Sequence, residues 1–201
     1  MRRLTLLSSS CALLALLVVL PVAAQRAGPA RSSDAPAPAA AASGAPAALE
    51  DGVAVFFSPS GGALDALVAQ INAAKKRLDV QAYLLTTREL AKPIADAHAR
   101  GVRVRVLLDR GNAGDEYSSA TFFANAGVPV WLDGEHKEAH NKVMLIDGRT
   151  IVTGSMNFTK AADESNAENL VLIDNKPKLF AAFQRNFDEH LKHARPYEKR
   201  N

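Results

Sequence analysis

The chain has 201 residues but a single cysteine, Cys11. One thiol cannot form a disulfide within the chain, so the fold must be stabilised by its own hydrophobic core. A chain of this length can bury such a core as one domain with appendages.

Long runs of positive charge are also missing. Two of the 24 Lys and Arg lie in residues 1–24, and the remaining 22 nearly balance the 21 Asp and Glu. The local clusters Lys75–Arg77 and Arg100–Arg110 are more typical of a solvated helix end and the outer face of a strand than of a nucleic-acid-binding arm. Net charge therefore does not identify the partner.

The longest apolar run, Cys11–Leu20, is too short to span a bilayer comfortably. Arg2 and Arg3 precede it and the small residues Val22–Ala24 follow it, which is the pattern of a secretory signal peptide. We therefore expect residues 1–24 to be cleaved. The mature protein is then expected in the periplasm or outside the cell, with no stable membrane insertion.

Residues 25–50 are rich in Ala, Pro and Ser and contain almost no large apolar side chain. Such a segment cannot bury enough surface to offset the entropy lost on ordering, so it is predicted to be a disordered tether. Its repeated prolines argue against a helix in the Ala-rich part. The folded domain is expected over residues 51–198.

Helical and strand patterns alternate through this domain. The expected strands are at 53–57, 78–85, 102–106, 128–132 and 170–173, the expected helices at 63–74, 86–101, 121–126 and 177–191, with a hairpin from residue 143. Thr86 and Glu89 have the spacing of a capping box, and the valines of 102–106 alternate with arginines as in a strand with one solvated face. The alternation predicts an α/β or α+β fold layered around one sheet.

The stretch from His140 to Asn157 contains the strongest functional pattern. Val143–Ile146 is an apolar run followed by the turn dipeptide Asp147-Gly148, which predicts a β-hairpin. Residues two apart on a strand share a face, so His140 and Lys142 should point the same way. Ser155 and Asn157 repeat this spacing beyond the returning strand. An imidazole beside fixed donors for anionic oxygens suits phosphoryl chemistry.

The combination of His140, Lys142, Asp147, Ser155 and Asn157 resembles the HKD motif of the phospholipase D superfamily. The resemblance extends over nearly all of the chain from residue 53 and is greatest to the small exported bacterial endonucleases with one such motif. A mitochondrial cardiolipin hydrolase or piRNA nuclease is a more distant relative. Further landmarks of the branch are Phe57–Pro59, Ala82–Tyr83, Arg100–Val102 and Asn166–Asn169.

The resemblance implies a phospholipase D-like layered α/β sandwich, with a mixed β-sheet flanked by helices. It also implies a homodimer, because members use two motifs and this chain has one, so the site would form at a two-fold interface. One His140 would form a phosphohistidine intermediate, while His140 of the second subunit would protonate the leaving oxygen and then activate water.

The resemblance also implies the remaining roles. Lys142 and Asn157 would bind the phosphate oxygens, and Ser155 would assist. Glu168 would bond the second ring nitrogen of His140. Asp147 lies at the turn and is expected to be structural. No metal or other cofactor is implied.

The other histidines are given ordinary interpretations. His98 is expected on a helix surface, and His136 has only a weak case as a substrate contact at the mouth of the site. His190 and His193 share a helix face, but without a third ligand nearby a solvated helix end is the favoured interpretation over a metal pair.

Three functions remain open from the sequence. A nuclease cleaving DNA or RNA without sequence preference is favoured. A phospholipase D acting on phosphatidylcholine-type lipids would use the same chemistry, and Phe122, Phe123 and Trp131 could contribute to the apolar rim that a membrane enzyme needs. A non-catalytic nucleic-acid-binding module is disfavoured because the motif is complete.

Overall fold

The computed structural model describes residues 47–49, 51–112 and 118–198. The predicted signal peptide, residues 1–24, and most of the predicted tether, residues 25–50, lie outside these residues. Within the described part, no helix has both the length and the apolar character needed to cross a bilayer.

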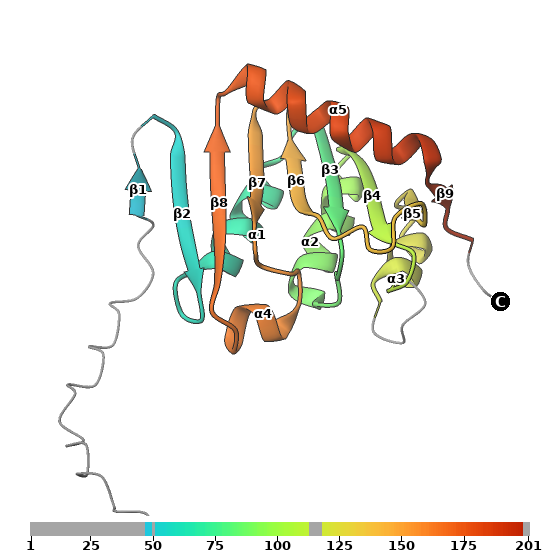
Figure 1. Cartoon of the computed structure of the whole chain (residues 1–201), viewed down its shortest axis with the longest axis horizontal. Coiled ribbons are helices and arrows are strands. Elements are labelled where there is room, and N and C mark those ends of the chain that lie inside the picture. The colour runs from blue at the N-terminus through green and yellow to red at the C-terminus, as the bar shows by residue number, and fades with distance from the viewer. Residues whose placement is uncertain (1–46, 50, 113–117, 199–201) are drawn as a thin grey trace, which may run out of the picture. The chain divides into compact units, whose positions relative to one another are not determined.

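A nine-stranded sheet organises the described residues, in the order β1-β2-β8-β7-β6-β3-β4-β5-β9 (Figure 1). The strands are β1 Ala47–Leu49, β2 Val53–Ser58, β3 Arg77–Ala82, β4 Arg103–Asp109, β5 Val130–Asp133, β6 Lys142–Ile146, β7 Thr150–Gly154, β8 Glu168–Asp174 and β9 Arg195–Pro196. The β3–β4 and β4–β5 pairs are parallel and the other pairs are antiparallel. The predicted mixed sheet is thus confirmed.

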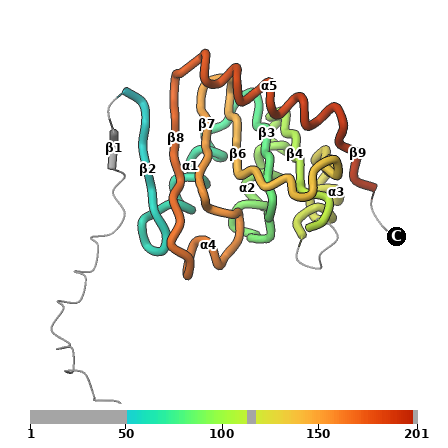
Figure 2. Tube along the Cα trace, in the orientation of Figure 1, coloured from blue at the N-terminus to red at the C-terminus, as the bar shows by residue number. Residues whose placement is uncertain are grey.

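Helices cover both faces of this sheet. They are α1 Ala63–Ala73, α2 Arg88–Ala99, α3 Ala120–Asn125, α4 Lys160–Glu164 and α5 Pro177–His193. Side chains from α1 to α4 join one buried cluster with the sheet, and α5 closes a second, smaller cluster on the opposite face. The red trace of α5 in Figure 2 runs across β7, β6, β3 and β4. The layered α/β sandwich is therefore confirmed.

Strand β6 lies at the centre and is buried on both faces. Met144 and Ile146 belong to the cluster below α1 and α2, whereas Val143 and Leu145 pack beneath α5. This two-residue alternation explains why the strand reads as a continuous apolar run. It also fixes the register of the hairpin, because a one-residue slip would exchange the two faces.

The hairpin turn is built as its sequence indicates. Asp147 and Gly148 have φ of 53° and 78°, and the Arg149 N–H donates to the Ile146 carbonyl at 3.0 Å. Positive φ at both central residues gives the turn a twist that matches the paired strands.

Several predicted boundaries were wrong. β1 lies inside the segment predicted as a tether, because its backbone pairs with β2 across a turn at Asp51 and Gly52. β3 ends at Ala82 rather than Leu85. The proposed capping box is also wrong: the N-cap of α2 is Thr87, whose hydroxyl bonds the Glu89 carboxylate instead of a backbone amide.

The outer face of β4 is only partly solvated: Arg103 is exposed as predicted, but α5 packs over Arg105. Arg105 donates to both carboxylate oxygens of Asp79 at 2.7 Å and to Asp188 of α5 at 3.1 Å. Asp79 is fully buried, so the arginine neutralises a charge that would otherwise be costly to bury. The pKa of Arg105 is raised chiefly by its hydrogen bonds to Asp79.

Candidate active site

His140 and Lys142 meet where the central hairpin begins. Lys142 opens β6 and is buried, whereas His140 lies in the loop before it and is exposed. The Lys142 Nζ lies 2.9 Å from His140 Nδ1, 3.2 Å from Nε2 and 2.8 Å from the His140 carbonyl oxygen. The two side chains therefore share a face, and the ammonium holds the exposed ring in place.

Tyr83 completes this arrangement, although it was predicted only as a landmark of the family. Its ring centroid lies 4.3 Å from that of His140 and 5.1 Å from the Lys142 Nζ. Its N–H donates to the Asn141 carbonyl at 2.8 Å, which joins the end of β3 to the loop that carries His140. The available signal in the sequence was an aromatic residue near the end of the strand predicted at 78–85, and the pairing of β3 with β6 explains its place beside His140.

The electrostatic environment of Lys142 favours anion binding. Burial lowers the pKa of its ammonium, while the negative charges of Glu168 and Glu138 oppose this effect. A partly desolvated cation interacts more strongly with a phosphate than one in bulk water does.

Ser155 and Glu168 form a second group at the ends of β7 and β8. The Ser155 hydroxyl donates to Glu168 at 2.5 Å and accepts from the Asn169 N–H at 3.0 Å. Gly154 allows this approach, because a Cβ there would lie 2.2 Å from the Asn169 carbonyl oxygen. The strand ends are therefore held close, with the hydroxyl between them.

Glu168 does not make the hydrogen bond to His140 that the resemblance implied. Its carboxylate accepts from Ser155 and, at 3.1 Å, from Asn166 Nδ2, and no bond to His140 is found among the described residues. Its charge does act on Lys142. The predicted role in orienting His140 therefore remains a prediction.

Asn157 and Asp147 behave differently from each other. The Asn157 amide oxygen is buried without a hydrogen-bond partner among the described residues. Such an acceptor costs about 1–3 kcal/mol and calls for an explanation, of which a role at a functional site is one. Asp147 instead accepts backbone N–H bonds from Lys75, Lys76 and Arg77 at 2.8, 2.7 and 2.9 Å. These contacts are of the structural kind expected for it.

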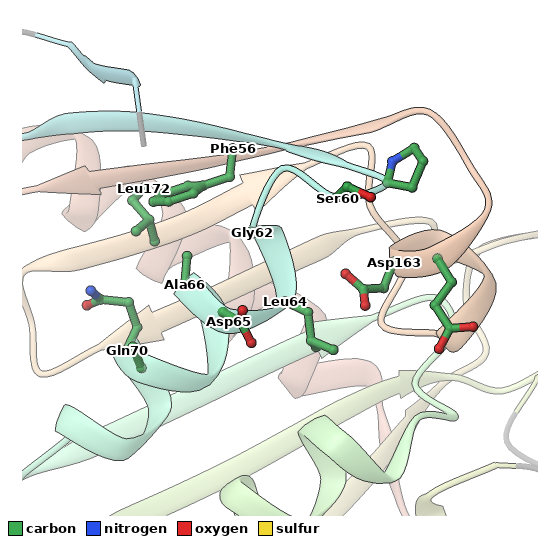
Figure 3. Close-up of a pocket in the computed structure, with 12 residues that line it drawn as sticks. Phe56, Ser60, Gly62, Leu64, Asp65, Ala66, Gln70, Asp163 and Leu172 are labelled. Atoms are coloured by element: carbon green, nitrogen blue, oxygen red, sulfur yellow. The ribbon is translucent and has the colours of Figure 1, made fainter. Parts of the chain in front are cut away.

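A large cavity lies elsewhere, between β2, α1 and α4 (Figure 3). Its volume is about 820 Å³, and its lining includes Asp65, Asp163 and Glu164 but none of the predicted catalytic residues. Burial, reinforced by the charges of Asp65 and Glu164, raises the pKa of Asp163. An acidic lining repels a phosphodiester, so this cavity does not suit the predicted substrate.

One expectation about the histidines was wrong. His190 and His193 were expected to lack a third metal ligand nearby. Asp133 and His136 lie beside them, and the four residues form one group of potential ligands. Asp133 ends β5, and α5 packs across the sheet so that its last turn reaches this strand end. The group comes from segments more than 50 residues apart, so sequence spacing could not reveal it.

Comparisons with known proteins identify the family. Residues 67–191 match the family model described as cardiolipin synthase, PLD-like domain. The chain belongs to the phospholipase D superfamily. This membership is also supported by the crystal structure of Nuc from Salmonella typhimurium, a phospholipase D family member. Nuc is 34% identical to this chain with a TM-score of 0.71, and the match covers 73% of this chain and 98% of Nuc.

Curated relatives carry lipid-related names. A phospholipase D from Rickettsia prowazekii is 37% identical over 135 residues, and the match covers 67% of this chain and 65% of that protein. A mitochondrial cardiolipin hydrolase from Chlamydomonas reinhardtii is 32% identical, with 66% and 59% covered. The chain therefore matches slightly less than two thirds of the length of these relatives.

Proposed function

We propose that this phospholipase D superfamily member hydrolyses phosphodiester bonds through a phosphohistidine intermediate at His140. The observation that carries the proposal is the exposed His140 ring, whose Nδ1 lies 2.9 Å from the ammonium of the buried Lys142. The Lys142 Nζ lies within hydrogen-bonding distance of both ring nitrogens, and an ammonium can only donate, so a neutral ring offers it the lone pair of the nitrogen that carries no hydrogen. A phosphate oxygen can replace the ring as the ammonium's partner and bring phosphorus to that lone pair.

The reaction proceeds in two balanced steps. A ring nitrogen of one His140 attacks phosphorus, the P–N bond forms and the bond to the leaving oxygen breaks as that oxygen takes a proton from a second His140. The second imidazole then takes a proton from water, whose oxygen attacks phosphorus and breaks the P–N bond. The products are an alcohol and a phosphomonoester, and Lys142 and Asn157 stabilise the charge on the phosphate oxygens throughout.

This mechanism needs two copies of His140, so we propose a homodimer with the site at its two-fold axis. Support comes from the single motif and from the exposure of His140 in one chain. Mixing His140→Ala chains with wild-type chains should yield heterodimers with one intact histidine and greatly reduced turnover. A fully active monomer in analytical ultracentrifugation would contradict the proposal.

Nucleic acid is the proposed substrate, with endonuclease activity that does not depend on sequence. Among the described residues, the large exposed apolar side chains are Phe57, Phe122 and Leu179, which belong to three different elements, β2, α3 and α5. Phe123 is fully buried and Trp131 packs against the core beneath α5, so the aromatic residues considered for a membrane rim do not gather into one. An enzyme that acts at a membrane needs a contiguous apolar surface, so this distribution favours nucleic acid as the substrate.

The alternative is a phospholipase D, favoured by the names of the curated relatives. Purified mature protein should be incubated with plasmid DNA, RNA and phosphatidylcholine vesicles, each with and without EDTA. We expect nicking of plasmid DNA or cleavage of RNA that persists in EDTA and is lost in His140→Ala. Release of choline alone would support the lipid substrate, and binding of nucleic acid without cleavage would support the non-catalytic module.

Export to the periplasm or beyond the cell is also proposed, on the basis of the signal-peptide pattern in residues 1–24. The intact mass of protein recovered from a periplasmic extract should lack these residues. Full-length protein confined to the cytoplasm would contradict it.

A further inference from the structure

Four potential metal ligands converge where β5 ends and α5 finishes. Asp133 is the last residue of β5, His136 lies in the loop that follows, and His190 and His193 lie in the final turn of α5. One ligand atom from each residue lies within 4.8 Å of all the others. None of these residues belongs to the HKD motif.

The Asp133 carboxylate is the centre of the group. Its Oδ2 lies 2.5 Å from His190 Nδ1, while its Oδ1 lies 3.2 Å from His193 Nε2 and 3.5 Å from His136 Nδ1. The three imidazole rings lie 4.8–5.4 Å apart, centroid to centroid.

The ligand types select the class of metal. Three imidazole nitrogens and one carboxylate oxygen suit Zn²⁺ and neighbouring transition-metal ions, whereas Mg²⁺ and Ca²⁺ prefer oxygen ligands throughout. In a tetrahedral zinc site with bonds of about 2.0 Å, the ligand atoms lie about 3.3 Å apart. The Asp133 Oδ1 atom already lies at close to this spacing from His193 and His136, at 3.2 and 3.5 Å, whereas His190 lies 2.5 Å from the other oxygen, Oδ2.

The burial of the four side chains indicates that the fold already holds two of the ligands in place, while the other two are free to move. Asp133 is completely buried and His190 is 13% exposed, so these two ligands are held by the fold. His193 and His136 are 31% and 47% exposed, so they can rotate inward and close the longest separations. The Glu135 N–H donates to Asp133 Oδ1 at 3.1 Å and so helps to orient the carboxylate, as outer contacts do at metal sites.

We propose that Asp133, His136, His190 and His193 form a binding site for a divalent transition-metal ion, Zn²⁺ in particular. The site is structural, because four protein ligands leave no open position for a substrate. It cross-links the end of α5 to the loop between β5 and β6. That loop leads directly into His140, and its Ala139 N–H is held by the Asp109 carboxylate at 2.9 Å.

The test uses the untagged mature protein and ZnCl₂ as the only added ligand. Metal content after gel filtration should be one zinc per chain, and zinc at about 100 times its Kd should raise the melting temperature by about 5–10 °C. Substitution by Co²⁺ should give the intense visible absorption of a tetrahedral site. EDTA should reverse all three effects.

A pair of matched variants separates a metal site from a hydrogen-bonded cluster. The double variant His136→Gln/His193→Gln keeps side chains that can donate to Asp133 but removes two imidazole ligands. It should fold, lose the zinc-dependent shift and bind less than a tenth of the metal. His98→Gln, in α2 and outside the group, should behave as the wild type.

The proposal is overturned if the wild-type protein retains no stoichiometric metal, or if the double variant binds zinc as tightly as the wild type. A melting temperature that responds to neither zinc nor EDTA in any variant would assign the group to hydrogen bonding alone.

Discussion

The two histidine-containing groups of this protein differ in the charge that faces the imidazole. At His140 the neighbour is the Lys142 ammonium, which can only donate, whereas at His190 and His193 it is the buried Asp133 carboxylate, which can only accept. A ring nitrogen beside an ammonium offers a lone pair to an electrophile. A ring nitrogen beside a carboxylate must either donate a hydrogen bond to it or bind, together with it, the same metal ion.

The two groups also differ in how they are held. The HKD residues come from one hairpin and its continuation, and His140 and Ser155 are exposed at the end of the hairpin opposite the Asp147 turn. The four-residue group depends on α5 reaching across the sheet to the end of β5. The first arrangement suits a site that must receive a large substrate, and the second suits a fixed cross-link. Substitutions in one group should therefore leave the other intact.

The largest effect is expected from His140→Ala. This variant removes both the nucleophile and the acid, so kcat/KM should fall by more than about 10⁴-fold. Its melting temperature and its zinc-dependent shift should match those of the wild type, because an exposed loop side chain is lost. Loss of zinc binding in this variant would show that the two groups are coupled.

Lys142→Ala should cause the second-largest loss of activity, after His140→Ala. Removing a preorganised donor at a developing negative charge costs about 3–4 kcal/mol of transition-state stabilisation, and the two-fold site would lose two at once. We expect a fall in kcat/KM of at least about 10³-fold in a steady-state assay. Lys142→Arg keeps the positive charge and should be partly active. If both variants lose activity equally, the packing of the Lys142 side chain, rather than its charge, determines activity.

Chelation should affect the Asp133 group but not the HKD site. EDTA should lower the melting temperature of the protein by about 5–10 °C if zinc was bound. At a temperature well below the transition, the rate of phosphodiester cleavage should be unchanged, because His140 and Lys142 require no metal. Complete loss of cleavage that only Mg²⁺ restores would overturn the metal-free mechanism.

The hairpin and its chemistry were predictable because the relevant residues are close in the chain. The Asp147-Gly148 turn and the apolar run of β6 place Lys142 at a strand start, and a two-residue period brings His140 onto its face. The same reasoning missed Tyr83, whose contact with His140 depends on β3 pairing with β6. It also missed the Asp133 group and the cover that α5 gives to Arg105, since the position of a terminal helix is a tertiary property.

Asp147→Asn should act on stability rather than on turnover. Burial raises the pKa of Asp147, but backbone hydrogen bonds from Arg77, Lys76 and Lys75 outweigh it and lower the pKa overall. A lowered folded-state pKa contributes stability that is present above the unfolded value, about 4, and is lost as pH falls through the folded value. The melting-temperature difference between wild type and variant should therefore be largest near neutral pH and shrink in acid. A constant difference at every pH would contradict this account.

The smallest effect is expected from Glu168→Gln. Glutamine can still accept one of the two bonds that Glu168 receives from Ser155 and Asn166, so the ends of β7 and β8 should stay together. The change removes a negative charge that raises the pKa of Lys142, so the basic limb of the kcat/KM–pH profile should move to lower pH. We expect about tenfold loss of kcat or less at neutral pH. Ser155→Ala is the matched control, because it removes the same hydrogen bond without altering the charge and should leave the basic limb in place. If both variants shift the profile equally, Glu168 acts through Ser155 rather than through its charge.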